Sequence, residues 1–256
     1  MQPFISRGEG KKLIINNNMK LSDVIFVDTE TTSSKDARLL QLGTMKYGET
    51  VPKVNSYKPA VPIEIEAMVV HGITNEEAAL FPEINFSEET KKELLPLILV
   101  AHKADFDIEV LKKEGIQTGL FIDTLKVAQT IIDSPSHGNQ YLRYFLNLEV
   151  SKGAKPHDAG GDVLVLEALF KYLFVKVKEL MEEENCGLIE VKEEDILNRM
   201  IKISSEPVLL KKVPFGKYKG MSFEEALEKD ASYLRWMIQQ KDLSDDLKYT
   251  LNKYLS

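Results

Sequence analysis

The feature that most constrains the fold is a long helix predicted from Asp162 to about Glu184. Its first half, as far as Phe170, is apolar on almost every side, which is typical of a helix packed inside a protein. Its second half narrows to one apolar stripe, so we expect the helix to emerge at the surface there. Asp162 therefore places a charge at the mouth of the core, where a charge needs a partner.

Short apolar runs upstream of this helix predict a sheet for it to cover. The run 24–27 is bounded by turn formers and suits a buried central strand. The other expected strands cover residues 38–47, 54–57, 97–101 and 121–123. The other expected helices cover residues 63–70, 87–95, 106–113, 124–132 and 141–148, and one more begins after an N-cap at Thr74. Strands come first and then mix with helices, which indicates an α/β fold with a mixed sheet and helices on its faces.

At 256 residues the chain is long enough for one large domain and one small one. Its first residues lack periodicity, and a charged, weakly patterned stretch with a short helix separates two ordered regions. The expected division is a disordered leader at 1–20, a large α/β domain at 21–185, a linker at 186–206 and a small C-terminal α/β module at 207–256.

The composition argues against a membrane span and excludes a disulfide within the chain. No apolar run approaches the ~20 residues that cross a bilayer, and the N-terminus lacks the pattern of a secretion signal. Cys186 is the only cysteine, which fits a reducing compartment. We therefore expect a cytoplasmic protein with no membrane partner.

The net charge of −7 argues mildly against a nucleic-acid partner, but the charge is unevenly distributed. Residues 207–256 hold nine Lys and Arg against seven Asp and Glu, a net of +2, which leaves −9 for the rest of the chain. Part of that excess lies in carboxylate clusters that a bound metal would neutralise. Nucleic acid therefore stays open as a partner.

Three short acidic clusters occur in one order along the chain: VDTET at 27–31, AHKADFD at 101–107 and HDAGGD at 157–162. Residues two apart in a strand point the same way, so Asp28 and Glu30 project from one face at the end of the first strand. Two carboxylates this close repel each other unless a cation lies between them. Taken alone, however, this pattern occurs often by chance.

The other two clusters also have a simpler explanation when each is taken alone. Asp107 and Asp162 begin predicted helices, where the helix dipole favours a carboxylate without any function. His157 precedes two glycines on a segment that we expect to be flexible, and a lone histidine is most often a surface residue. Only the combination of four carboxylates with one imidazole indicates a site.

That combination suits metal-assisted hydrolysis of phosphodiester bonds. Mg²⁺ prefers oxygen ligands and keeps several waters, so a few carboxylates suffice. Two such ions ~4 Å apart can hold the attacking water and the leaving oxygen of an in-line displacement. A neutral imidazole with a pKa near ~6.5 can take the proton of that water, which gives His157 the role of general base.

In their order and spacing, VDTETT, HKADFD and HDAGGD resemble the three motifs of the DEDDh, or DnaQ-like, 3′→5′ exonuclease family. The segment 66–74 also resembles that family's stretch between the first two motifs, so the likeness covers roughly residues 22–180. It implies a ribonuclease H-like α/β fold and two Mg²⁺ ions, for which Mn²⁺ can substitute.

The resemblance also implies roles for individual residues. Asp28, Glu30 and Asp162 would bind the metals directly, Asp107 would bind mainly through water, and His157 would be the base. The remaining implied residues are Thr31, which would help to seat the 3′-terminal nucleotide, and His71, which would lie near its sugar or base. One departure is Lys103, where the family usually has Asn after the histidine of the second motif.

The segment from Pro214 to Gly220 is a basic and aromatic turn framed by glycines, and Ser222 is predicted to cap the helix that follows. The simplest interpretation is a hairpin turn plus two short helices with an aromatic core. A second interpretation is that Lys217 and Lys219 contact phosphates. This segment resembles the C-terminal domain of the exodeoxyribonuclease X group, which implies DNA 3′ ends as substrate.

Three other functions remain open. An RNA 3′-end trimmer could use the same fold, because a filter for the 2′-OH depends on pocket shape. A proofreading subunit of a DNA polymerase would be expected to have a binding tail, and the folded C-terminal module argues against it. An inactive nucleic-acid-binding module would be expected to lack at least one of the five site residues, and none is missing.

Overall fold

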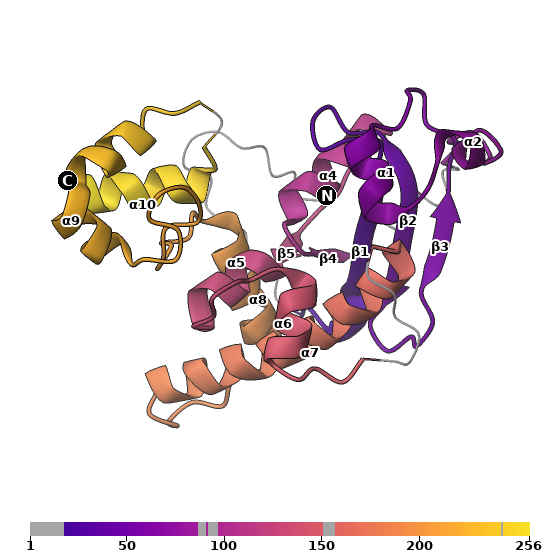
Figure 1. Cartoon of the computed structure of the whole chain (residues 1–256). Helices are drawn as coiled ribbons and strands as arrows, with labels where there is room; N and C mark the ends of the chain where they lie inside the picture. The colour runs from indigo at the N-terminus through magenta and orange to yellow at the C-terminus, as the bar shows by residue number, and fades with distance from the viewer. Residues whose placement is uncertain (1–17, 87–90, 92–96, 151–156, 242) are drawn as a thin grey trace.

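The computed structural model describes residues 18–86, 91, 97–150, 157–241 and 243–256 (Figure 1). The leader expected at 1–20 lies outside the described residues except for its last three positions. The helix expected over 87–95 lies outside them except for Lys91. Within the described part of the chain, no helix combines the length and apolarity needed to cross a bilayer.

Five strands form one sheet in the order β3-β2-β1-β4-β5. Their bounds are Val24–Thr31 (β1), Leu39–Lys46 (β2), Lys53–Ser56 (β3), Ile98–Ala101 (β4) and Phe121–Asp123 (β5). The first three strands pair antiparallel, whereas β4 pairs parallel with both β1 and β5. The predicted mixed sheet is therefore confirmed, with the apolar run 24–27 in its central strand.

The helices flank this sheet or follow it in the chain (Figure 1). A 3₁₀ turn, η1, covers Leu21–Asp23. The α-helices of the first half are α1 (Ile65–His71), α2 (Asn75–Ala78), α4 (Ala104–Lys113) and α5 (Thr124–Ile131). Those of the second half are α6 (Asn139–Phe145), α7 (Ala159–Glu184), α8 (Glu193–Ser205), α9 (Phe223–Met237) and α10 (Asp245–Leu255). Thr74 caps α2 as expected, since its side chain accepts from the backbone of Glu77.

Alternation along β1 divides the interior into two cores. Val24 and Phe26 face α5, α6, α7 and α8, whereas Ile25 and Val27 face α4 on the other side of the sheet. Because successive strand residues point to opposite faces, this alternation continues to the end of β1. It places Asp28 on the α7 face and Thr29 on the α4 face.

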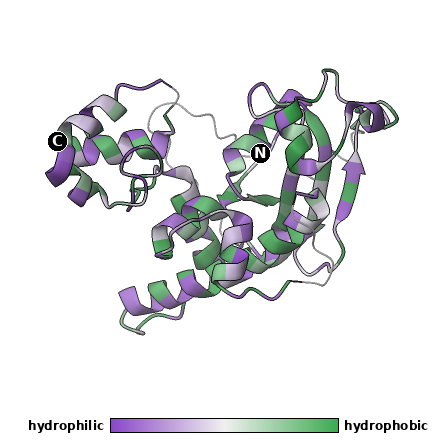
Figure 2. Cartoon of the chain, in the orientation of Figure 1, coloured by the Kyte–Doolittle hydropathy of each residue, from purple (hydrophilic) through white to green (hydrophobic). Residues whose placement is uncertain are grey.

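Helix α7 is buried along its first half, as its sequence predicts. Phe170 packs edge-on against Phe26, with ring centroids 5.4 Å apart. The opposite end of α7 mixes hydrophilic and hydrophobic residues and extends away from the sheet (Figure 2). The helix therefore fixes the position of Asp162 through a large apolar contact with the sheet.

The range expected to be a linker, 186–206, is more ordered than its charged sequence suggests. It contains the thirteen-residue helix α8, which packs against α5, α7 and β5. Ile196, Leu197 and Met200 on its apolar face are fully buried in the same core as α7. Ser204 Oγ also accepts the backbone N–H of Asp123 at 2.8 Å. The short helix expected in this range is therefore present, and it packs into the core through one apolar face.

The C-terminal residues form a separate apolar cluster built from α9, α10 and the turn before them. Phe223, Leu234 and Leu251 lie at its centre, fully buried. The β component expected here is reduced, among the described residues, to one antiparallel bridge between Lys212 and Ser222. Ser222 caps α9 as predicted. The boundaries of the two domains stay a prediction.

Candidate active site

Three carboxylates meet where β1 ends and α7 begins. One oxygen from each of Asp28, Glu30 and Asp162 lies within 4.8 Å of the other two. Asp28 and Glu30 are two residues apart on β1, so both side chains point to the face covered by α7. Asp162 lies in the first turn of that helix. Residues more than 130 apart in sequence thus form one acidic cluster.

A glycine in the neighbouring strand makes this approach possible. Gly43 of β2 pairs with Asp28 across the sheet. A Cβ added to Gly43 would lie 2.5 Å from the backbone oxygen of Ala159, the first residue of α7. Gln41 of the same strand also holds the start of α7, because its side-chain oxygen accepts the Ala159 N–H at 3.2 Å. The sequence placed Gly43 in a strand without showing what it touches.

Three hydrogen bonds hold Asp162, two to its carboxylate and one to its backbone oxygen. The backbone N–H of His157 donates to its Oδ2 at 2.8 Å, and Gln140 Nε2 donates to its Oδ1 at 2.5 Å. Asn139 Nδ2 donates to its backbone oxygen at 3.3 Å. Asn139 and Gln140 open helix α6, and nothing in their local sequence distinguishes them from an ordinary helix start. The carboxylate is 9% exposed, so these donors fix its orientation.

The fourth carboxylate, Asp107, comes from the other side of the sheet. It lies in the first turn of α4, is 5% exposed, and its Oδ1 accepts from Thr29 Oγ1 at 2.7 Å. Its charge is close enough to raise the pKa of Asp28. All four predicted carboxylates therefore belong to one electrostatic cluster.

Burial and mutual repulsion disfavour the ionised forms of Asp28, Glu30 and Asp107. Burial, followed by the charges of Asp107 and Asp162, raises the pKa of Asp28 well above its usual range. Burial and then the charge of Asp162 raise the pKa of Glu30 to about 7. Burial is the largest cause that raises the pKa of Asp107 to about 7. A bound cation would relieve all three effects, so the donor set fits a hard divalent metal.

His157 lies immediately before the N-cap of α7. It is exposed, and its backbone has φ 59°, in the left-handed region. The structure differs from the expected flexible glycine segment, because α7 already begins at Ala159 and includes both glycines. Asp158 caps that helix by accepting from Gly161 N–H at 3.1 Å. The position of His157 is thus tied to the helix start through its own backbone.

His71 and Thr31, both expected near the substrate, lie close to each other. Thr31 is buried at the end of β1 and its hydroxyl donates to Ser33 O at 2.9 Å. His71 Nδ1 accepts from Ile73 N–H at 3.0 Å, so in the neutral ring the proton is on Nε2. Burial lowers the pKa of His71, against an opposing interaction with the Thr31 backbone. Its Nε2 has no hydrogen-bond partner in good geometry among the described residues.

The backbone conformation of Lys103 fits the Asn that the resembled family usually has at this position. It precedes α4 with φ 71°, a conformation that Asn tolerates better than Lys. Its N–H donates to Asp123 Oδ1 at 3.0 Å, and Ala104 N–H donates to Asp123 Oδ2 at 3.2 Å. Asp123 is 3% exposed and also caps α5. It is a structural carboxylate that sequence reasoning did not single out.

Lys217 and Lys219 belong to the C-terminal turn, whose helices α9 and α10 lie apart from the sheet (Figure 1). Lys217 Nζ lies 3.1 Å from Asp230 Oδ2 and 4.8 Å from the centroid of the Tyr218 ring. Lys219 is exposed. The structure therefore does not bring these lysines to the acidic cluster.

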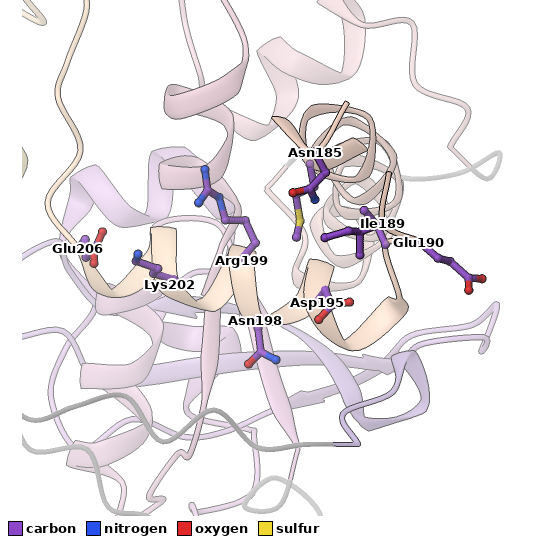
Figure 3. Close-up of a pocket in the computed structure, with 10 residues that line it drawn as sticks. Asn185, Ile189, Glu190, Asp195, Asn198, Arg199, Lys202 and Glu206 are labelled. Carbon is purple, nitrogen blue, oxygen red and sulfur yellow. The ribbon is translucent and has the colours of Figure 1, made fainter. Parts of the chain in front are cut away.

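A separate cavity of about 690 Å³ lies between the end of α7 and helix α8 (Figure 3). Arg199 and Lys202 line it from α8, and Asn185 and Ile189 line it from the chain after α7. None of the residues that line it belongs to the acidic clusters. It is thus distinct from the candidate active site.

Known exonucleases match this chain over most of its length. A family model described as Exonuclease matches residues 25–170, and one described as Exodeoxyribonuclease X-like C-terminal matches residues 214–242. Exodeoxyribonuclease 10 of Escherichia coli strain K12 is 27% identical over 241 residues, which cover 90% of this chain and 97% of that protein. Both segments singled out in the sequence are thus matched.

Two further matches are weaker. A DNA polymerase III subunit epsilon-like protein of Rhodobacter capsulatus is 26% identical over 187 residues, which cover 66% of this chain but 26% of that protein. The solved structure of exonuclease X in complex with 5′ overhanging duplex DNA superposes with a TM-score of 0.54 at 23% identity. That match covers 71% of this chain and 99% of the other, and it supports the ribonuclease H-like fold.

Proposed function

The chain belongs to the exonuclease family, and we propose that it is a metal-dependent 3′→5′ exodeoxyribonuclease that releases nucleoside monophosphates from DNA 3′ ends. The observation that supports this most directly is the gathering of Asp28, Glu30 and Asp162 oxygens within 4.8 Å. The exonuclease family generally uses divalent metals. The C-terminal match and the E. coli relative favour DNA over RNA as substrate.

The proposed cofactor is Mg²⁺, as two ions, with Mn²⁺ able to substitute. Asp28, Glu30 and Asp162 would hold the ions directly, since their oxygens converge, and Asp107 would act through water. When bound, the ions would neutralise the charge of the phosphate and activate the attacking water. Asp107 is kept in place by its bond from Thr29.

The proposed reaction is hydrolysis of the last phosphodiester bond of the strand. Water attacks the phosphorus, the bond from phosphorus to the 3′ oxygen of the preceding nucleotide breaks, and a nucleoside 5′-monophosphate leaves. The His157 imidazole takes the proton of the water, because histidine is the side chain most often used as a general base. The shortened strand keeps the 3′ oxygen, which takes up a proton.

Two residues are proposed to position the terminal nucleotide. Among the described residues His71 Nε2 makes no hydrogen bond in good geometry, and His71 lies near the Thr31 backbone at the end of β1, so its proton could be donated to an oxygen of the sugar or base. Thr31 shapes the same region with its backbone and its methyl group, because its hydroxyl is already bonded to Ser33. We further propose a cytoplasmic location, which a single exposed cysteine, Cys186, suits.

The test is digestion of 5′-end-labelled single-stranded and double-stranded DNA, and of RNA with the same sequence, with Mg²⁺, with Mn²⁺ and with chelator. We expect a ladder that shortens from the 3′ end of DNA, release of mononucleotides, and no reaction with chelator. Faster degradation of RNA would instead favour the 3′-end trimmer. Cleavage at internal positions of a circular strand would contradict an exonuclease.

The role of His157 needs a separate measurement. His157→Ala should reduce turnover by roughly 10² to 10⁴-fold while Mg²⁺ affinity measured by calorimetry stays within about twofold of wild type, since only its backbone N–H contacts Asp162. If Mg²⁺ affinity falls in parallel with turnover, His157 is a ligand and not the base.

A further inference from the structure

Helix α6 exposes three aromatic side chains on one side. Tyr141 is 41% exposed, Tyr144 is 68% exposed and Phe145 is 45% exposed. Their spacing of three and four residues places them on the same face of the helix. Leu142, between them in sequence, is fully buried and anchors the helix to the core. Exposed aromatic patches of this kind are typical of binding surfaces.

The exposed side chains are already arranged for stacking. The rings of Tyr141 and Phe145 are stacked, with centroids 5.8 Å apart and 24° between their planes. The Arg143 guanidinium lies 5.4 Å from the centroid of the Tyr144 ring. Arg143 is the only charged residue of α6, so the helix is positive in a chain whose net charge is −7.

The same helix touches the acidic site. Gln140, immediately before Tyr141, donates to Asp162 Oδ1 at 2.5 Å, and Asn139 donates to the Asp162 backbone. Helix α6 also packs against α7. The aromatic face therefore lies on the helix whose first two residues contact the acidic site.

We propose that Tyr141, Tyr144 and Phe145 form a stacking platform for unpaired bases of the DNA strand whose 3′ end lies in the acidic site. This inference rests on the proposed function. Base stacking on aromatic rings tolerates any sequence, because every base has a π-face, and a guanidinium adds attraction to the nearby phosphates. Bases must be unpaired to stack in this way, so the platform favours single-stranded or frayed 3′ ends over fully paired ones.

Position favours DNA over a protein as the occupant of this face. The first residues of α6 contact a carboxylate of the acidic site. A protein partner placed here would lie beside the path of the substrate. A second copy of the chain is the other possible occupant, and the test below includes it.

The test uses the full chain with leucines at all three positions, Tyr141→Leu, Tyr144→Leu and Phe145→Leu, which keep the apolar area and remove the rings. Tyr249→Leu is the matched control, because Tyr249 is 44% exposed on α10. A short single-stranded oligonucleotide with 2-aminopurine near its 3′ end reports stacking by quenching, and it is titrated with chelator present so that it is not cut.

We expect the wild type and the Tyr249→Leu control to quench the probe equally. The Kd for the probe should be roughly tenfold to a hundredfold higher in the triple variant than in the wild type, because each lost stack weakens binding. A second variant, Tyr141→Phe with Tyr144→Phe, keeps the rings and should bind like the wild type. Unchanged Kd and quenching in the triple variant, with a normal melting temperature, would overturn the proposal.

Light scattering decides between DNA and self-association. A wild-type dimer that becomes a monomer in the triple variant, with DNA affinity unchanged, would mean that the face binds a second copy and would overturn the platform. Because the titration needs no cleavage, it also separates the two proposals. A wild type that binds and quenches the probe but never degrades DNA would contradict the exonuclease function alone.

Discussion

Asp28, Glu30 and Asp162 bring three carboxylates together at the end of β1, whereas in the C-terminal turn the carboxylate of Asp230 lies 3.1 Å from the ammonium of Lys217. Burial and then repulsion raise the pKa of Asp28, while hydrogen bonds from Ser232 and then from Lys217 lower the pKa of Asp230. The acidic cluster at the end of β1 contains carboxylates without a cationic partner among them, whereas in the C-terminal region the Asp230 carboxylate is paired with Lys217.

The surroundings of Asp230 show what the paired charges do. Tyr218 Oη donates to it at 3.1 Å, and Tyr233 N–H donates to it at 3.2 Å, where α9 is kinked. Gly216, with φ 78°, has no room for a Cβ, which would lie 2.1 Å from Tyr233 Oη. The basic and aromatic turn is thus joined to α9 by its polar groups. The paired charges of Lys217 and Asp230 stabilise the local fold, whereas the carboxylates of the acidic cluster are available to bind a ligand.

The strongest test of this contrast is Asp162→Asn. Loss of a metal-binding carboxylate should reduce exonuclease turnover on the order of 10³-fold or more. The metal-free variant should melt no lower than the wild type, because one member of a repelling cluster has been neutralised. Glu179→Gln, an exposed substitution on the same helix, should leave turnover unchanged. Near-normal turnover in Asp162→Asn would exclude it from the site.

Gly43→Ala tests whether the approach of α7 to the sheet assembles the cluster. The added methyl would meet the Ala159 backbone, so α7 must shift away from β2. We expect a loss of stability of about 1–3 kcal/mol and a fall in turnover of roughly tenfold to a hundredfold. Denaturant titration and single-turnover kinetics measure the two effects. Gly48→Ala, at a glycine with open space around it, controls for glycine loss, although its φ of 90° adds backbone strain.

The repulsion also predicts how stability depends on pH. Glu30 ordinarily titrates near 4.5, and in the folded protein its pKa is about 7. Between these values the folded state binds more protons than the unfolded state, so the stability of the metal-free protein falls as pH rises through this window. Mg²⁺ should restore more stability at about pH 8 than at about pH 5.5.

Asp28→Asn isolates this effect from other titrating groups. In chelator the melting temperature of the variant, relative to wild type, should increase between about pH 5.5 and about pH 8, by a few degrees. The stabilisation by Mg²⁺ should be smaller in the variant at every pH. A difference between the two proteins that does not change with pH would show that the carboxylates do not repel each other in the folded state.

The smallest effects are expected in the C-terminal turn, where the two lysines should now differ. Lys219→Ala should reduce the salt dependence of DNA binding by about one counterion if Lys219 contacts a phosphate. Lys217→Ala should mainly lower the thermal stability of this region, because Lys217 is paired with Asp230. The salt slope and the melting curve of each variant distinguish these roles. Equal changes in salt slope would show that Lys217 leaves Asp230 to bind DNA.

Patterns within single segments of the sequence were enough to predict the main strands and helices. Alternation placed Asp28 and Glu30 on one face of β1, the continuous apolar stretch after Asp162 identified a buried helix, and the mixed sheet followed from the order of strands and helices. These features depend on periodicity within one segment, which the chain displays directly. The four carboxylates and His157 could be named because they fall in three short motifs whose combination suits metal-assisted hydrolysis and whose order resembles a known family.

The tertiary structure decided which distant groups meet. The contact of Gly43 with Ala159, the hold of Gln140 on Asp162 and the pairing of Lys217 with Asp230 join residues from different elements. No local pattern records them, because they depend on how the elements pack and not on the periodicity within any of them. The same packing raises the pKa of Asp28, since burial and then repulsion both depend on distances that only the folded chain sets.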